Sequence, residues 1–177
     1  MRCVPWRPPT PPRKSEMPPV DLKKPVFARV TRHFNVSAER VFDAWLAPQM
    51  IGRWMFGPAI RNEEVVRMTA NAWVGGSFSF VVRRNDEEID HIGYYVEIVR
   101  PRRLVFTWAV APDRPDASHV YIDIVPQEKG CDLTLSHELH PDWADYIGRT
   151  EASWGIMLDS LAAALGERGT VVQRPRA

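Results

Sequence analysis

The spacing of apolar residues changes near residue 147, and this change constrains the fold more than any other feature of the chain. From Asn62 to about residue 139, apolar and polar side chains alternate, as they do in strands with one buried face. From Ile147 to Leu165 the apolar residues recur at helical spacing, and Gly166 follows as a stop signal. Because a one-faced sheet and an amphipathic helix bury their apolar sides together, the pattern predicts an α+β domain with a curved antiparallel sheet packed on a long C-terminal helix.

Seven strands and two short helices are predicted before that final helix. The first strand covers the alternating segment from Val26 to Phe34, and Ser37 is a good N-cap for the helix that follows it. Pro48 ends that helix or starts the next one. Short turns separate the later strands, so neighbours should pair as an antiparallel meander. These strands are predicted near Glu63–Met68, Ser77–Arg84, Ile89–Val99, Arg103–Val110, Ser118–Val125 and Cys131–Leu139.

The chain divides into a folded body at residues 25–166 and two tails. Residues 1–24 hold seven of the sixteen prolines, so we expect a disordered, proline-rich tail. Its Pro8-Pro9-Thr10-Pro11-Pro12 segment is a candidate ligand for a polyproline-reading domain, although a terminus without a role is the favoured interpretation. Residues 167–177 are predicted to be a short C-terminal tail.

Charge and composition exclude several classes of protein. The net charge of +1 combines a tail of +4 with a mildly acidic body, which offers no basic face for nucleic acid. Prolines interrupt any signal peptide, and no apolar run is long enough to span a membrane. Cys3 and Cys131 do not suggest a disulfide framework. We therefore expect a cytoplasmic protein, either a monomer or a homodimer.

Several motifs resemble the family related to the activator of the 90-kDa heat-shock protein's ATPase, within the START-like superfamily also called SRPBCC. The resemblance covers about Val26 to Leu165, and Arg103–Trp108 is its most specific part. Ser153 and Met55 depart from the residues common in the family, which are Gly and a second aromatic respectively. The matching motifs are Val41–Trp45 with Pro48 and Arg53-Trp54, Val74–Phe78, Gly93–Ile98 with Pro101, Arg103–Trp108, and His137 with Ser153-Trp154.

This resemblance implies a helix-grip fold, like that of the birch pollen allergen, with the order β-α-α-β(six strands)-α. It implies less about activity, because such families include chaperone regulators, binders of lipids or aromatic ligands, and proteins of no settled role. A fold of this kind hosts many functions, so function has to be argued from the site.

Aromatic side chains are the best candidates for the wall of an apolar pocket between the sheet and the last helix. For any single residue, filling the core is the more ordinary role. On the strand at 103–110 we expect Leu104, Phe106 and Trp108 to face inward, and Thr107 to face solvent. The predicted pocket residues are Trp45, Trp54, Phe56, Phe78, Phe80, Tyr94, Phe106, Trp108, Leu135, His137, Trp154 and Met157.

Polar groups that converge for chemistry are scarce. His137 has inward parity, and with Tyr94 it is a weak acid–base candidate, although a structural histidine is favoured. His137 and His140 point to opposite faces of a strand, so they do not predict a metal site. His91, His119 and the pair Glu63-Glu64 are predicted at the surface. No nucleotide-binding or triad motif is present, and no cofactor is expected.

Three functions fit these observations. The favoured one is noncatalytic binding of an apolar or aromatic small molecule in the predicted pocket. The second is a partner-binding role like that of the chaperone ATPase regulators, which the resemblance alone suggests. The third is an enzyme of the cyclase, dehydratase or hydrolase type that uses the same pocket.

Overall fold

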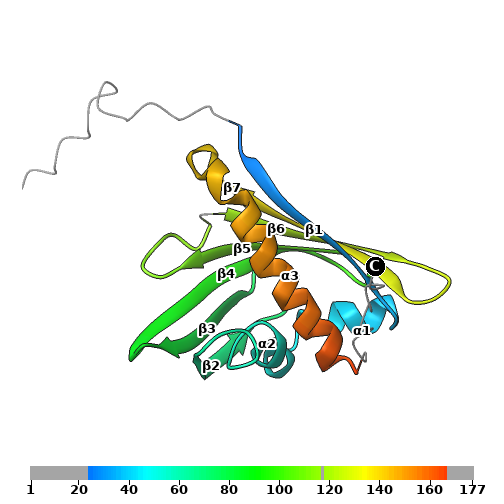
Figure 1. Cartoon of the computed structure of the whole chain (residues 1–177), viewed down its shortest axis with the longest axis horizontal. Coiled ribbons are helices and arrows are strands. Elements are labelled where there is room, and N and C mark those ends of the chain that lie inside the picture. The colour runs from blue at the N-terminus through cyan, green and yellow to red at the C-terminus, as the bar shows by residue number, and fades with distance from the viewer. Residues whose placement is uncertain (1–23, 117, 167–177) are drawn as a thin grey trace, which may run out of the picture.

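A computed structural model describes residues 24–116 and 118–166 of the chain (Figure 1). The predictions for the two tails therefore lie outside the described residues, except at Lys24. The described elements, in chain order, are β1 (Val26–Phe34), α1 (Ala38–Asp43), α2 (Pro48–Trp54), β2 (Glu64–Ala70), β3 (Ser77–Arg84), β4 (Glu87–Val99), β5 (Arg103–Val110), β6 (Ser118–Pro126), β7 (Cys131–Leu139), the 3-10 helix η1 (Pro141–Tyr146) and α3 (Ile147–Ala164).

One seven-stranded antiparallel sheet forms the body of the molecule, in the order β1-β7-β6-β5-β4-β3-β2. Successive strands from β2 to β7 pair with their neighbours, as the short turns predict, and β1 closes the other edge against β7. Figure 1 shows α3 crossing the sheet diagonally, with α1 and α2 near its C-terminal end. The predicted helix-grip arrangement is confirmed.

Local signals place the helices where the sequence predicts them. The Ser37 hydroxyl accepts a hydrogen bond from the Arg40 N–H at 3.4 Å, and it therefore caps α1. Pro48 occupies the first turn of α2, where its missing N–H costs nothing. On α3, Trp154, Leu158 and Leu161 face the core. No helix among the described residues is both long and apolar enough to cross a membrane.

Strand β5 is buried on both faces, which corrects one prediction. Leu104 and Phe106 face the core as predicted, but Thr107 is 0% exposed instead of facing solvent. The Thr107 hydroxyl accepts a hydrogen bond from the Tyr94 N–H at 3.0 Å, and Tyr121 lies opposite Val105. The outer face of β5 is covered because its side chains there, Val105 and Thr107, are shorter than those of the neighbouring strands β4 and β6, such as Tyr121.

Glu63 is also buried, although the sequence predicts a solvated carboxylate. Its side chain is fully enclosed and accepts hydrogen bonds from the Gly57 N–H at 3.0 Å and from Arg84 Nη2 at 2.8 Å. Arg61 Nε lies 3.8 Å away. Gly57 has a φ of +86°, a backbone conformation that favours glycine, and this turn brings its N–H to the carboxylate. Glu63 thus joins the turn after α2 to the end of β3.

Replacing Glu63 should therefore destabilise the fold far more than replacing its neighbour. We expect Glu63→Gln to lower the free energy of unfolding by roughly 1.5–3 kcal/mol, because charge-assisted hydrogen bonds to a buried carboxylate are lost while Arg84 stays partly solvated. Denaturant unfolding at neutral pH measures the difference. Glu64→Gln is the matched control, because Glu64 is exposed and pairs only with exposed Arg83. Equal effects for the two variants would show that Glu63 has no special role.

Candidate functional site

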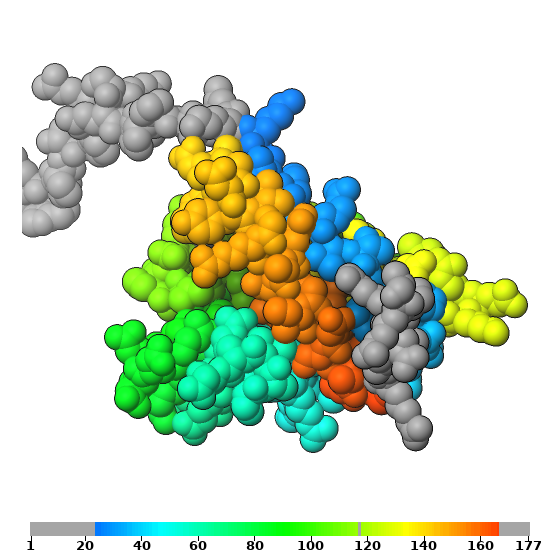
Figure 2. Space-filling model, in the orientation of Figure 1, coloured from blue at the N-terminus to red at the C-terminus, as the bar shows by residue number. Residues whose placement is uncertain are grey.

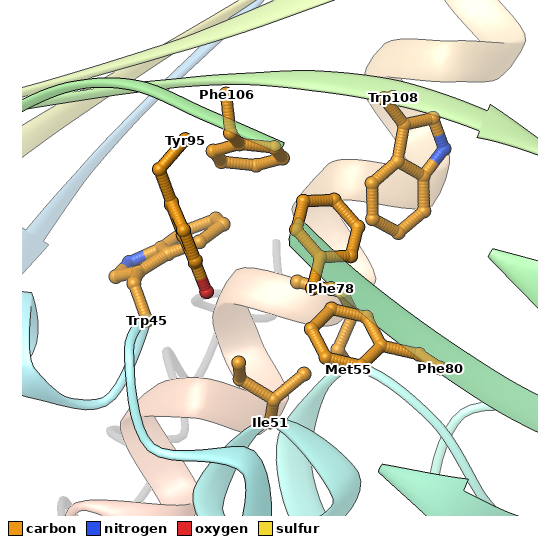
Figure 3. A pocket seen from close by; sticks show the side chains of 8 residues that line it. All are labelled: Trp45, Ile51, Met55, Phe78, Phe80, Tyr95, Phe106 and Trp108. Atoms are coloured by element: carbon orange, nitrogen blue, oxygen red, sulfur yellow. The ribbon is translucent and has the colours of Figure 1, made fainter. Parts of the chain in front are cut away.

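A small pocket lies where α2 and the segment after α1 face strands β3, β4 and β5. Figure 3 shows aromatic rings converging on it from both sides. Phe78 and Phe80 stack with ring centroids 4.7 Å apart, and Phe106 meets Phe78 edge-on at 6.0 Å. The eight lining residues are Trp45, Ile51, Met55, Phe78, Phe80, Tyr95, Phe106 and Trp108.

The pocket is nearly filled by its own walls. It measures about 220 Å³ when its mouth is included, but the space open to a water molecule is only about 10 Å³. That is close to the minimum that one water needs, and far below the roughly 300–1,000 Å³ of pockets for drug-sized ligands. Most of the lining is buried, and Trp108 is the one partly exposed residue in it.

Tyr95 provides a polar group in this apolar pocket. The residue is 2% exposed, and its hydroxyl has no hydrogen-bond partner among the described residues. Burial raises the pKa of Tyr95 to about 12, so the phenol is neutral at physiological pH. Figure 3 shows its oxygen between Trp45, Ile51 and Phe78. The buried indole N–H of Trp45 also lacks a partner, but Figure 3 shows its nitrogen on the side away from Phe78.

The pocket tyrosine is one residue further along β4 than the sequence predicts. Tyr94 is partly exposed and is not among the lining residues, whereas Tyr95 is. Gly93 shares the inner face with Tyr95, and a side chain there would lie 2.5 Å from the Phe78 ring. The glycine thus leaves room for that ring. The run Tyr94-Tyr95-Val96 contains no charged residue, so the sequence does not show which of the two tyrosines faces the core.

The other predicted pocket residues fall into two groups. Trp45, Phe78, Phe80, Phe106 and Trp108 are brought together around the void. The rest do not line it, since Trp54, Phe56, Leu135, His137 and Trp154 are buried in the surrounding structure and Met157 packs against the core from a partly buried position. The sequence analysis did not predict Ile51 and Met55 as lining residues, because nothing in the sequence distinguishes them from other apolar core residues.

His137 takes part in a hydrogen-bonded chain that joins α3 to the sheet. Trp154 Nε1–H donates to His137 Nδ1 at 3.1 Å, so the neutral imidazole carries its proton on Nε2. His137 Nε2 then donates to the Ser118 hydroxyl at 3.1 Å, and that hydroxyl donates to the Trp108 carbonyl at 2.9 Å. Burial lowers the pKa of His137 to about 4. Both ring nitrogens are thus engaged within the fold.

His91 is buried, and its prediction as a surface residue is wrong. Its ring lies 4.9 Å from Phe56 and 5.4 Å from Trp108, and its Nδ1–H donates to the Phe80 carbonyl at 3.3 Å. Burial lowers the pKa of His91. The sequence analysis assigns the wrong face of β4 to the core, because Ile92 and Tyr94 make the outer face appear to be the more apolar one.

Charged groups elsewhere do not assemble a reactive centre. Glu97 and Asp123 both pair with Arg103 on the outer face of the sheet, as cross-strand partners. His119 stacks on Tyr121 at 6.2 Å and lies 3.4 Å from Glu138. Within residues 24–116 and 118–166, no three His, Cys, Asp or Glu side chains gather as metal ligands.

Comparison with known proteins identifies relatives of this fold. The sequence profile of the family described as "Activator of Hsp90 ATPase homolog 1-like protein" matches residues 35–166. No curated protein sequence matches the chain.

Solved structures resemble the described fold over most of its length. A protein from Chromobacterium violaceum is 25% identical, with a TM-score of 0.66 over 82% of this chain and 100% of its own. A protein from Nitrosomonas europaea is 18% identical, with a TM-score of 0.68 over 80% and 94% of the two chains. The AHSA1-like protein from Aeromonas hydrophila is 19% identical, with a TM-score of 0.66 over 86% and 100%.

The buried His137 predicts a specific loss of stability in acid. Its pKa is about 4 in the fold and near 6.5 in the unfolded chain, so the unfolded chain binds the proton more tightly. The fold therefore has its full stability above pH 6.5 and loses up to about 3 kcal/mol as the pH falls to 4. Denaturant unfolding at several pH values measures this loss.

The control for this measurement separates His137 from the carboxylates, which also titrate in acid. His137→Gln should be less stable at pH 7 and should lack the loss attributed to the imidazole. His33→Gln, at an exposed position on β1, should keep the acid dependence of the wild type. If His137→Gln and the wild type lost the same stability between pH 6.5 and 4, the assignment would be wrong.

Proposed function

The chain belongs to the family of activator of Hsp90 ATPase homolog 1-like proteins, and we propose that it binds a small apolar or aromatic molecule without transforming it. The proposed site is the pocket beneath β3, β4 and β5. Its ligand is a molecule of about one ring that carries one hydrogen-bonding group. The observation that carries the proposal is the hydroxyl of Tyr95, which lies at the void and has no hydrogen-bond partner among the described residues.

The Tyr95 hydroxyl is not among the fully buried atoms without a partner, unlike Trp45 Nε1, so a molecule in the void can reach it. A polar group in an apolar wall gains from a hydrogen-bond partner, typically about 1 kcal/mol. The surrounding rings offer Tyr95 no acceptor, and the space beside it has room for about one water. A ligand with a hydroxyl or carbonyl would satisfy the phenol while its ring packs against Phe78 and Phe106.

The size of the pocket limits what it accepts. The enclosed space of about 10 Å³ holds no ring as it stands, so a single-ring compound, which needs the least displacement of the walls, suits it better than a lipid chain or a polycyclic molecule. Binding also requires side chains to move apart, because the interior is nearly filled. Trp108 is the candidate for this movement, since it is the one lining residue that is only partly buried. We therefore propose that the pocket opens as the ligand enters.

A catalytic role has less support from the geometry. His137, the best acid–base candidate in the sequence, uses both ring nitrogens within the fold. Tyr94 does not line the pocket, so the two do not form an acid–base pair there. A general acid or base has to reach the proton that it transfers, and neither group offers a free atom to the cavity.

A partner-binding role is the second candidate, and one observation favours it. Trp73 and Val74 in the β2–β3 turn are each 62% exposed, and large exposed apolar side chains of this kind are common at protein interfaces. The family name suggests the 90-kDa heat-shock protein as the partner to test. If this role is correct, the protein should stimulate the ATPase of that chaperone, and Trp73→Ala should abolish the stimulation.

Phenol and toluene provide a matched pair of probes for the proposed pocket, because they differ in one hydroxyl. We expect both to shift the NMR signals of the lining residues when they are titrated into the protein. In Tyr95→Phe, the ratio of phenol to toluene affinity should fall about five- to tenfold, the equivalent of one hydrogen bond of roughly 1–1.4 kcal/mol. Comparing this ratio between Tyr95→Phe and the wild type cancels the different hydration of the two probes, because that difference is the same for both proteins.

Tyr94→Phe is the control, because it removes a hydroxyl from the neighbouring residue outside the pocket. It should leave the affinity ratio unchanged. If neither probe perturbs the lining residues of the wild type, the binding proposal is wrong. If both bind but the ratio is the same in Tyr95→Phe, the pocket binds ligands without using the Tyr95 hydroxyl.

A further inference from the structure

An exposed aromatic pair lies on η1, at the opposite end of α3 from α1. Trp143 is 55% exposed and Tyr146 is 46% exposed, and their ring centroids are 5.0 Å apart with planes at 50°. Burying two such rings in contact with a partner would release much apolar surface from water. Figure 1 shows this turn projecting beyond the sheet before α3 begins. No residue of this turn lines the proposed ligand pocket.

The same segment is acidic. Residues 138–151 contain four carboxylates and one arginine, a net charge of −3. Asp142 and Asp145 are exposed on η1 itself, next to the two rings. We call Asp142, Trp143, Asp145 and Tyr146 the η1 surface. Its chemistry, with aromatic rings between carboxylates, suits an extended segment rich in proline and basic residues.

The chain contains a segment of that chemistry, and this segment leads into β1 close to the η1 surface. β1 begins at Val26, which pairs with Leu139 at the end of β7, four residues before Trp143. Residues 1–23 lie outside the described part, and in sequence residues 1–24 combine seven prolines with a net charge of +4. Figure 2 shows the start of β1 next to the gold turn that contains η1.

We propose that the N-terminal tail docks on the η1 surface of its own chain, with Pro18 and Pro19 packed against Trp143 and Tyr146. Proline rings bind aromatic-lined grooves well, because the polyproline II conformation loses little entropy on binding. The pair precedes Lys24 by five or six residues, a reach of roughly 15–19 Å at about 3.1 Å per residue. Lys14, Lys23 and Lys24 lie on either side of the prolines, beyond Glu16 and Asp21, and in the docked tail they face the carboxylates of η1.

Docking in this way gives the tail and the exposed aromatic pair a common explanation. The two prolines supply the apolar contact, and the charges orient the segment along the surface. Because each exposed ion pair contributes at most about 1 kcal/mol, we expect the contact to weaken as salt is raised towards about 1 M, where the Debye length is about 3 Å.

A spin label in the tail tests the proposal on the full-length chain. Cys131 is fully buried, so Cys3→Ser combined with Ser15→Cys gives one reactive thiol, three residues from Pro18. The measurement is the broadening of the indole N–H signals of Trp143 and Trp73. Trp73 is an exposed internal reference, because it lies between β2 and β3 at the opposite sheet edge from β1.

The deciding comparison is between the natural tail and a tail with Pro18→Ser and Pro19→Ser, because any tail attached at Lys24 passes near η1. We expect the Trp143 signal to broaden several-fold more with the natural tail than with the serine variant. A second test addresses the charges of the η1 surface.

The double variant Asp142→Asn with Asp145→Asn should reduce the broadening of the Trp143 signal. The double variant Glu87→Gln with Glu128→Gln removes the same charge from two remote hairpins, and as the matched control it should leave the broadening unchanged.

Two results would overturn the proposal. Equal broadening of Trp143 in the natural and serine tails would show that the prolines make no contact. Broadening that appears when isotope-labelled chains without the spin label are mixed with spin-labelled, unenriched chains would show that the tail binds a second copy and not its own chain. Circular dichroism and thermal unfolding of each variant verify that the fold is intact.

Discussion

The hydrogen bond from Trp154 to His137 is the interaction on which the arrangement of helix and sheet depends. Apolar burial turns the face of α3 that carries Trp154, Leu158 and Leu161 towards the sheet, but it is not directional and does not fix the exact rotation of the helix. The indole N–H has to meet Nδ1 of a neutral imidazole, and the chain of bonds continues through Ser118 to the Trp108 carbonyl. One polar path therefore links α3 with β7, β6 and β5.

This path also determines which parts of the pocket wall are rigid. The Trp154 ring lies 6.1 Å from both Trp45 and Trp108, so fixing Trp154 fixes one side of each. Trp45 is further held by Trp54, whose N–H donates to the Ala44 carbonyl at 3.1 Å. The side chain of Trp108 makes ring contacts but no hydrogen bond among the described residues, and it is partly exposed. Opening of the pocket is therefore easier at Trp108 than at Trp45.

The sequence predicts the elements of this fold better than it predicts which side chains meet. Alternation and helical spacing locate every strand and the long helix, because these patterns follow from burial of one face. They fail where both faces are buried or where apolar residues are consecutive, as at Thr107 on β5 and at Tyr94-Tyr95 on β4. Glu63 could not be recognised as buried, because Arg84, its partner, is 21 residues away and the turn at Gly57 supplies the other donor.

The buried polar groups of this protein differ in how they are satisfied. His137 is bonded on both nitrogens, Glu63 accepts from a backbone N–H and an arginine, and Thr107 accepts from the Tyr94 N–H. The fold supplies partners to these three groups, whereas the buried nitrogens Trp45 Nε1, Arg32 Nε and Arg84 Nε have none among the described residues. The Tyr95 hydroxyl differs from both sets, because it has no partner among the described residues but keeps access to the small void. A group placed in this way can bond to a molecule that enters the void, and the binding proposal uses this position.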